Sequence, residues 1–282
     1  MNAVAICTDS SALFPEGVVE RLGVSVVPIA ITLDDAPFDE KDASLDEFYA
    51  RLSEGAKVTT SQPSPGAFVE TYARAAADGA SESLSIHLDT RVSGTAGSAK
   101  LAAREAPIPV TVVDTQTVSF GVGLCVRAAA AAIAAGASAA EAAASARRVG
   151  ATLRNVFVAH RGPPGRLPDA AGWAVLEFTD GKAEPVGACD TIGEAIDAMV
   201  ARVLAGDHAV SAAVGHAGPA TEPAADALAL SFATLTHVVE VERYRVGAAV
   251  GAHTGPFSFG AFWLPSSESP RSGSGWHPVL AP

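Results

Sequence analysis

Short β-rich apolar runs alternate with segments of helical spacing along the first half of this chain. The predicted strands lie at residues 3–8, 24–31, 83–88 and 110–113, and the predicted helices at residues 15–22, 45–52, 67–77 and 98–105. A parallel strand is joined to the next by a crossover that is usually a helix. The alternation therefore predicts a mainly parallel sheet with helices on both faces.

An alanine-rich stretch at residues 125–146 follows these elements and is predicted to be one helix. Its length and small apolar residues suggest a membrane span at first sight. Arg127 and Glu141 lie within it, however, and charges at such positions are costly in a bilayer. We expect a packed helix of a globular protein and no membrane insertion.

The pattern changes near residue 156, where a short strand at 156–159 is followed by a segment rich in Gly and Pro. At 282 residues and 49% hydrophobic content, the chain is long enough for two ordinary domains. We predict an N-terminal domain at 1–155, a C-terminal domain at 156–264 and a disordered Ser-, Gly- and Pro-rich tail at 265–282.

The second domain is expected to begin with a β-hairpin, because Asp180-Gly181 suits the positive-φ turn that joins antiparallel strands. The hairpin strands are predicted at 173–178 and 184–188, further helices at 192–204 and 223–230, and further strands at 210–215, 237–242 and 246–251.

The charge and the cysteine pattern exclude several classes of partner. A net charge of −12 without clustered Lys or Arg argues against binding to nucleic acid or to an anionic membrane surface. Cys7, Cys125 and Cys189 lie far apart and form no CxxC pair, so we expect small core residues. The seven histidines include no HExxH or HxH pair, and no carboxylate cluster has ligand spacing, so we expect no metal. We also expect no cofactor. The N-terminus lacks the features of a signal peptide, which predicts a cytoplasmic location.

Polar loops follow several predicted strands, and ligands of open α/β sheets bind beyond the carboxyl ends of the strands. One loop, at residues 59–66, has hydroxyls between stiffening prolines, and another, at 87–98, opens a helix whose free amides favour an anion. A third, at 251–256, presents a histidine and a threonine between glycines. The competing interpretation of each loop is a helix cap or a structural turn.

Taken in order, these segments resemble the motif series of the DegV family over about residues 1–264. The motifs are Thr8-Asp-Ser-Ser-Ala12, Val26-Val-Pro-Ile29, Glu47-Phe-Tyr49, Thr60-Ser-Gln-Pro-Ser-Pro-Gly66, Ser93-Gly-Thr95, Val113-Asp-Thr115 and Gly251-Ala-His-Thr-Gly-Pro256. The resemblance implies a two-domain α/β protein. Its N-terminal domain would be a three-layer α/β/α structure on a parallel sheet, and its C-terminal domain a two-layer α/β structure on a mixed sheet.

The resemblance also implies a function, which is to hold one long-chain fatty acid without catalysing a reaction. The acyl chain would lie in an apolar tunnel, and a fatty-acid kinase would phosphorylate the presented carboxylate to supply phospholipid synthesis. A buried carboxylate needs several hydrogen-bond donors, because an unpaired buried charge is costly. The carboxylate-binding residues carried over from the family are Thr60, Ser61, Ser93, Gly94, Thr95, His253 and Thr254.

Two segments depart from the family pattern. Residues 160–172 stand where the family has a leucine-rich helix and a Gly-Gly-Arg-Ile segment associated with kinase docking, and Arg161 and Arg166 are the cations available to replace it. The second departure places Asp89 beside the expected anion site, where the family commonly has serine. This charge opposes anion binding unless Arg91 neutralises it.

Two other functions remain open from the sequence. A Ser-dependent hydrolase would use Ser93 as nucleophile, His253 as base and Asp114 as orienting carboxylate, although the chain has no G-x-S-x-G elbow. Alternatively, the altered segment at 160–172 would leave a scaffold protein that no longer binds lipid.

Overall fold

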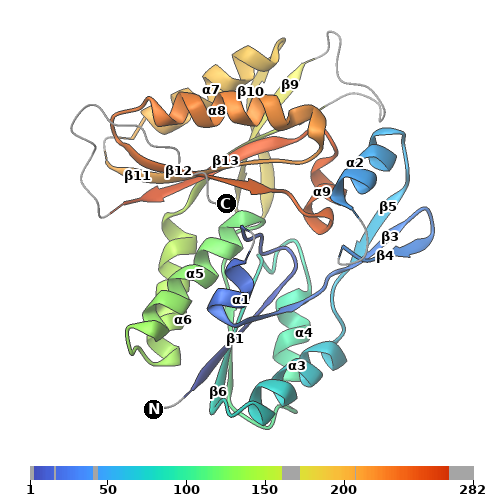
Figure 1. Cartoon of the computed structure of the whole chain (residues 1–282), viewed down its shortest axis with the longest axis vertical. Coiled ribbons are helices and arrows are strands. Elements are labelled where there is room, and N and C mark those ends of the chain that lie inside the picture. The colour runs from blue at the N-terminus through green and yellow to red at the C-terminus, as the bar shows by residue number, and fades with distance from the viewer. Residues whose placement is uncertain (1–2, 16, 41–43, 161–171, 207, 267–282) are drawn as a thin grey trace.

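The computed structural model describes residues 3–15, 17–40, 44–160, 172–206 and 208–266. These residues form an N-terminal α/β unit, a C-terminal α/β unit stacked on it, and a small three-stranded sheet beside them (Figure 1). The expected tail from residue 267 onward, together with Arg161 and Arg166, lies outside the described residues.

The N-terminal unit is built on a four-stranded parallel sheet in the order β2-β1-β6-β7, which confirms the predicted sheet. Apolar side chains of α5 and α6 pack on one face, and those of α3 and α4 pack on the other. The elements are β1 (Val4–Asp9), α1 (Val18–Leu22), β2 (Val24–Val27), α3 (Pro65–Ala77), β6 (Glu82–His87), α4 (Thr95–Ala102), β7 (Val110–Asp114), α5 (Phe120–Ala134) and α6 (Ala139–Thr152).

The alanine-rich stretch forms two helices, so the prediction of a single helix is wrong. Gly136 takes a φ of 91°, which breaks the stretch after α5. Ser138 and Glu141 then form a reciprocal capping box that starts α6. Within the described residues, no helix is long and apolar enough to cross a membrane.

The C-terminal unit has a six-stranded mixed sheet covered by α7 and α8, which gives the two predicted layers. The hairpin turn at Asp180 and Gly181 has positive φ at both residues, as its sequence predicts. In sheet order the strands are β10 (Lys182–Cys189), β9 (Trp173–Thr179), β8 (Arg154–His160), β13 (Phe259–Pro265), β11 (Val210–His216) and β12 (Val238–Arg245), and the helices are α7 (Ile192–Leu204), the short 3-10 helix Pro219–Thr221 and α8 (Glu222–Ala233).

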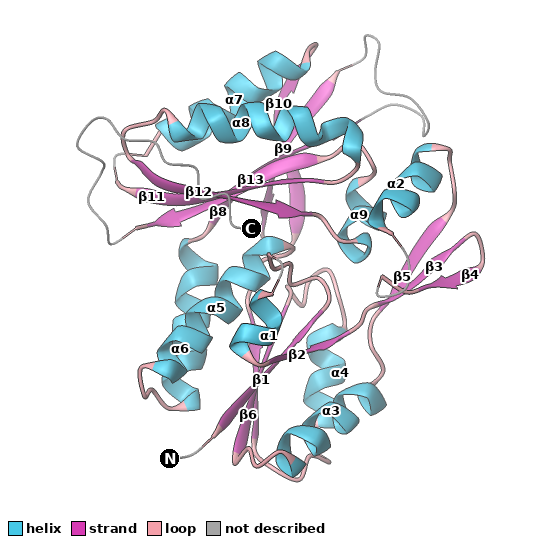
Figure 2. Cartoon of the chain, in the orientation of Figure 1, coloured by secondary structure: helices cyan, strands magenta, loops and turns pink. Residues whose placement is uncertain are grey.

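The small sheet contains β4, β3 and β5 and lies beside α2 and α9 (Figure 2). Residues 24–31 were predicted to form one strand, but they divide between β2 and β3. Pro28, which has no amide to donate to a ladder, stands at the break. The elements of this region are β3 (Ala30–Leu33), β4 (Ala36–Phe38), α2 (Leu45–Ser53), β5 (Val58–Ser61) and α9 (Ala248–Thr254).

Residues 246–251 were predicted to be a strand, and this prediction is wrong because most of them belong to α9. A short apolar run does not distinguish a strand from a helix by its periodicity. The Ala248 amide at the start of α9 donates to the Glu40 carboxylate, which satisfies one free helix-end amide.

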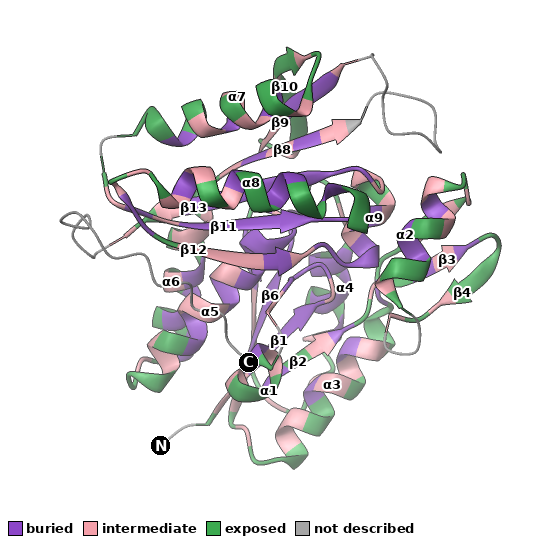
Figure 3. Cartoon of the chain, turned by 45° about the horizontal axis from the view of Figure 1, so that its top comes forward, coloured by how far each residue is buried: buried purple, intermediate pink, exposed green. Residues whose placement is uncertain are grey.

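The unpredicted strand β13 runs between β8 and β11 and is buried along most of its length (Figure 3).

Candidate functional site

A cavity of about 900 Å³ lies between the two units, within the size range of about 300–1,000 Å³ typical of ligand pockets. Strands of the C-terminal sheet provide most of its apolar wall. Loops after β1, β6 and β7, together with β5 and α9, provide the polar side. The cavity therefore has the mixed character that suits a molecule with an apolar body and one polar end.

One row of paired residues crosses the C-terminal sheet beneath this cavity. Tyr244 pairs with Gly215, Gly215 with Gly260, Gly260 with Phe157, and Phe157 with Leu176. Directly paired residues point to the same face of a sheet. The Tyr244 ring lies over Gly215 and Phe157 lies close to Gly260, so neither position has room for a side chain. All of the row except Gly215 lines the cavity.

The structure brings the predicted carboxylate-binding residues to one side of this cavity. Thr95 does not line it but lies fully buried behind Ser93, with 2.8 Å between the two hydroxyl oxygens. The predicted residues that line the cavity are Thr60, Ser61, Ser93, Gly94, His253 and Thr254.

Thr60 and His253 join two distant parts of the chain. Thr60 Oγ1 lies 2.9 Å from His253 Nε2, and this hydrogen bond connects the end of β5 to the last turn of α9. His253 and Thr254 were predicted to lie on a loop, but both belong to the helix. Gly255, which takes a φ of 81°, ends it. A helix end presents these side chains more rigidly than a loop.

The Ser93 turn stands at the N-terminus of α4, as predicted. The Thr95 amide donates to Ser93 Oγ at 3.2 Å, so Ser93 is already oriented by its own turn. A side chain at Gly94 would collide with the amide group of Gln62, which donates to Ser98 Oγ at 3.2 Å. Gly94 therefore leaves room for the Gln62 side chain, which a larger residue would displace from Ser98.

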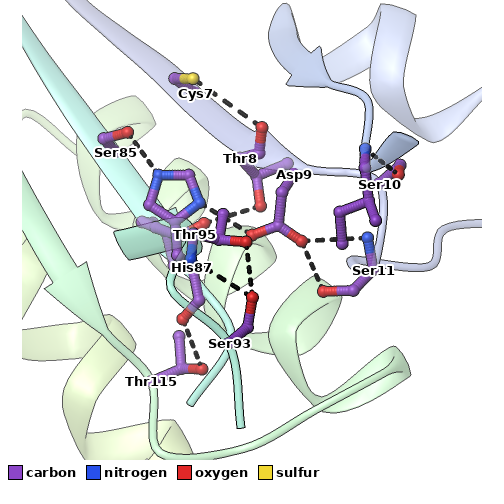
Figure 4. Close-up of polar contacts among 12 residues, drawn as sticks. Cys7, Thr8, Asp9, Ser10, Ser11, Ser85, His87, Ser93, Thr95 and Thr115 are labelled. Atoms are coloured by element: carbon purple, nitrogen blue, oxygen red, sulfur yellow. Dashed lines mark hydrogen bonds and ion pairs between the residues drawn. The ribbon is translucent and has the colours of Figure 1, made fainter. Parts of the chain in front are cut away.

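A buried polar network lies behind the cavity wall (Figure 4). Asp9 Oδ2 lies 2.8 Å from His87 Nδ1, and His87 Nε2 lies 2.7 Å from Ser85 Oγ, which in turn bonds to the Tyr72 hydroxyl. Ser11 lines the cavity and donates its hydroxyl to Asp9 at 2.5 Å. The polar residues after β1 therefore cap no helix but tie β1 to β6 and hold Ser11 in place.

The structure shows how the charge of Asp89 is balanced. The Asp89 carboxylate is buried, and the Arg91 guanidinium contacts both of its oxygens at 2.7 to 3.0 Å. The Arg91 amide donates to the same carboxylate at 2.8 Å. Arg91 thus neutralises the negative charge that the sequence places near the expected anion site.

The three residues of the hydrolase hypothesis make separate contacts. Ser93 bonds to Thr95, His253 to Thr60, and Asp114 to the Thr90 hydroxyl and the Gln116 amide. In the part of the chain that the structure describes, no hydrogen bond joins Ser93 to His253 or His253 to Asp114. Across all the residues that the structure describes, no group of His, Cys, Asp and Glu side chains could hold a metal ion.

Several residues of the cavity wall were missed by the sequence analysis. Phe157 lies on the strand predicted at 156–159, but the face of that strand was not assigned. Tyr244 lies beyond the strand predicted at 237–242, which continues to Arg245 in the structure. The available signal was glycine at Gly215 and Gly260, because a glycine inside a strand often marks a place where something approaches the backbone.

Comparison with known proteins agrees with this architecture. The model of the "uncharacterised protein, DegV family" matches residues 3–162. A DegV domain-containing protein of Streptomyces coelicolor is 36% identical over 271 residues, which cover 90% of this chain and 95% of that protein.

Two solved structures are similar in fold and sequence. A DegV family protein from Thermus thermophilus, described with fatty-acid binding, is 31% identical with a TM-score of 0.84 over 94% of this chain and all of that chain. DegV of Bacillus subtilis, described as a fatty acid binding protein, is 25% identical with a TM-score of 0.81 over the same shares. With a matching family model, a relative aligned over nearly its whole length and the same two-unit fold, the chain belongs to the DegV family.

Proposed function

We propose that this protein binds one long-chain fatty acid in the cavity between its two units, without a cofactor and without catalysing a reaction. The observation that carries the proposal is the continuity of one cavity from an apolar wall on the C-terminal sheet to the polar groups of Thr60, Ser93 and His253. The fatty-acid binding named for the Thermus and Bacillus relatives supports it.

The apolar wall supplies the driving force for binding in this proposal. Each methylene group buried against Phe157, Leu176 or Phe262 contributes about 0.8 kcal/mol before the costs of association. A long chain therefore gains more than a short one. This dependence on length is characteristic of a lipid carrier rather than of a site for small polar acids.

The polar side supplies the donors for the carboxylate in this proposal, drawn from Thr60, Ser61, Ser93, Gly94, His253 and Thr254. Thr95, which does not reach the cavity, would act by orienting Ser93. Ser61 is exposed and its hydroxyl makes no hydrogen bond to the described residues, so it is free to donate. Hydrogen bonds to an ionised acceptor are stronger than neutral ones. The hydrogen bond between Thr60 and His253 holds both side chains before the ligand arrives, which lowers the ordering cost. When His253 Nε2 donates in this bond, the Thr60 hydroxyl keeps its proton for the carboxylate.

We further propose that the carboxylate is presented to a partner enzyme, a fatty-acid kinase. The polar side of the cavity includes the exposed Ser61 and the half-buried Thr60, which supports access from solvent at that end. In the test, fatty-acid-loaded protein is incubated with a kinase catalytic subunit and ATP, and acyl phosphate is measured. Absence of acyl phosphate with a fully loaded protein would contradict the kinase partner but not the binding function.

The binding function is tested by titrating lipid-free protein with stearic acid and following the heat of binding. We expect saturation at one fatty acid per chain. A folded protein that takes up none would contradict the proposal and favour the scaffold role.

A further inference from the structure

The hydroxyl of Tyr244 has no hydrogen-bond partner among the described residues, although its side chain lies in the wall of the cavity. Tyr244 is 7% exposed, lines the cavity, and its Oη makes no hydrogen bond to any described residue. Among the described residues, Ser83 Oγ is the enclosed side-chain atom without a partner, so the Tyr244 oxygen is not sealed in the protein but open to the cavity. A buried tyrosine hydroxyl usually has a partner.

The ring of Tyr244 is held firmly by its neighbours. It stacks on Phe120 with 4.3 Å between the ring centroids and an angle of 15°, and Phe262 packs at 6.4 Å. The ring lies across Gly215, where any side chain would collide with it. It therefore extends from the edge strand β12 over β11 towards Gly260 on β13, which lines the cavity.

Most other polar side chains of the cavity wall are already engaged. The Asn155 amide exchanges two hydrogen bonds with the main chain of Phe178, and the Ser258 hydroxyl donates to Thr254. Like the Tyr244 hydroxyl, the hydroxyls of Ser61 and Ser119 make no hydrogen bond to the described residues. Ser61, however, is exposed to solvent. Ser119 directly precedes Phe120, on which the Tyr244 ring stacks, so this part of the wall holds two free hydroxyls.

We propose that Tyr244 is a specificity-determining residue whose hydroxyl binds a hydroxyl group on the acyl chain, so that the preferred ligands are hydroxylated fatty acids. The inference rests on the proposed fatty-acid binding and names the class of fatty acid. An unsatisfied buried donor costs free energy that a matching ligand group recovers, which is why sites built to bind a hydroxyl reject analogues that lack it.

The chemistry of the phenol suits this role. A phenol can both donate to and accept from an alcohol. Burial raises the pKa of Tyr244 above its usual range, so the group keeps its proton and remains a donor. A hydroxyl that lies against the apolar wall, away from Tyr244 and the other free hydroxyls of the cavity, would be buried without a partner and would weaken binding. The preference is therefore expected to depend sharply on the position of the hydroxyl.

The experiment compares stearic acid with a series of hydroxystearic acids that differ only in the position of the hydroxyl, using the full-length protein and its Tyr244→Phe variant. We expect one isomer to bind the unmodified protein roughly fivefold or more tightly than stearic acid, the value of one net hydrogen bond. In Tyr244→Phe this advantage over stearic acid disappears.

Tyr49→Phe is the matched control. Tyr49 is also a buried tyrosine of the same apolar cluster, but its hydroxyl donates to the Val246 carbonyl at 2.8 Å and it does not line the cavity. This variant is expected to keep the preference for the hydroxylated isomer, because it leaves the cavity hydroxyl of Tyr244 in place.

Three results would overturn the inference. The first is tighter binding of stearic acid than of every isomer by the unmodified protein, and the second is a preference that persists in Tyr244→Phe. A loss of affinity for all the acids alike in Tyr244→Phe would instead assign Tyr244 to the carboxylate. In each of these cases the unmodified protein still binds fatty acids, whereas uptake of no acid at all by the folded unmodified protein would overturn the proposed function and this inference together.

Discussion

Arg91 of the N-terminal unit reaches across to Asp180 of the C-terminal hairpin, with 3.0 Å between Nη1 and Oδ1. The same guanidinium holds the buried Asp89 carboxylate at 2.7 Å. Leu88 and Val92 on one side of this contact and Gly181 on the other line the cavity. One arginine therefore joins the two units beside the proposed ligand.

Arg91→Ala is expected to destabilise the protein far more than Asp180→Asn does. Removing Arg91 leaves the buried Asp89 charge without its partner, and we expect a loss of about 1–3 kcal/mol in the free energy of unfolding. Asp180 is 88% exposed, so its loss should cost less than about 1 kcal/mol. Urea unfolding of both variants measures the difference. Equal losses in the free energy of unfolding would contradict the conclusion that Arg91 stabilises the protein by neutralising the buried Asp89 carboxylate.

Gly181→Ala is expected to loosen the hairpin from the N-terminal unit and speed the release of a bound fatty acid. Gly181 has a φ of 77°, and an added side chain would collide with the Arg91 side chain. Gly136→Ala is the control, because Gly136 also has a positive φ of 91° but open space around it. Exchange of labelled fatty acid should accelerate in Gly181→Ala only, whereas equal rates in both variants would exclude a role for this contact in closure.

Thr60→Val is expected to lower the affinity for fatty acid roughly tenfold. The change removes the hydroxyl that bonds to His253 and leaves the volume of the side chain, so one donor is lost and the other loses its orientation. Thr59→Val, at the exposed neighbouring position of the same strand, should bind as the unmodified protein does. Calorimetric titration measures both, and an unchanged affinity in Thr60→Val would remove Thr60 from the site.

Ser85→Ala and Ser83→Ala should shift stability in opposite directions although both sites lie buried on β6. Ser85 bonds to His87 and Tyr72, so its loss leaves buried partners unsatisfied and should cost about 1–3 kcal/mol. Ser83 Oγ has no partner among the described residues, so removing it should stabilise the protein by up to about 1 kcal/mol. Chemical unfolding of the two variants provides the test. Destabilisation by Ser83→Ala as large as that by Ser85→Ala would contradict this account of the buried network.

Much of the fold follows from local sequence signals. The alternation of strands and helices predicts the N-terminal sheet. The Asp180-Gly181 pair predicts the hairpin turn because such pairs favour positive φ, and both residues do take positive φ in the structure. The failures occur where tertiary contacts decide. Residues 248–252, before His253, form a helix, and the first amide of this helix donates to the carboxylate of Glu40. Glu40 is distant in the sequence, so the residues around 248 do not predict this partner.

The candidate site is predictable only in part for the same reason. Ser93 and Thr95 lie close in sequence, so their turn is visible as a local pattern. Thr60 and His253 are separated by 193 positions, and only the folded chain shows that they share a hydrogen bond. Tyr244 is hidden more deeply, because its orientation depends on Gly215 in a neighbouring strand.

Mass spectrometry of an organic extract from the purified, folded protein tests most directly whether the cavity holds a fatty acid. Native mass measurement of the same sample gives the stoichiometry. We predict one long-chain fatty acid per chain, with hydroxylated acids enriched over their share of the cellular pool. A protein that is empty as purified and takes up no added fatty acid would contradict the claim.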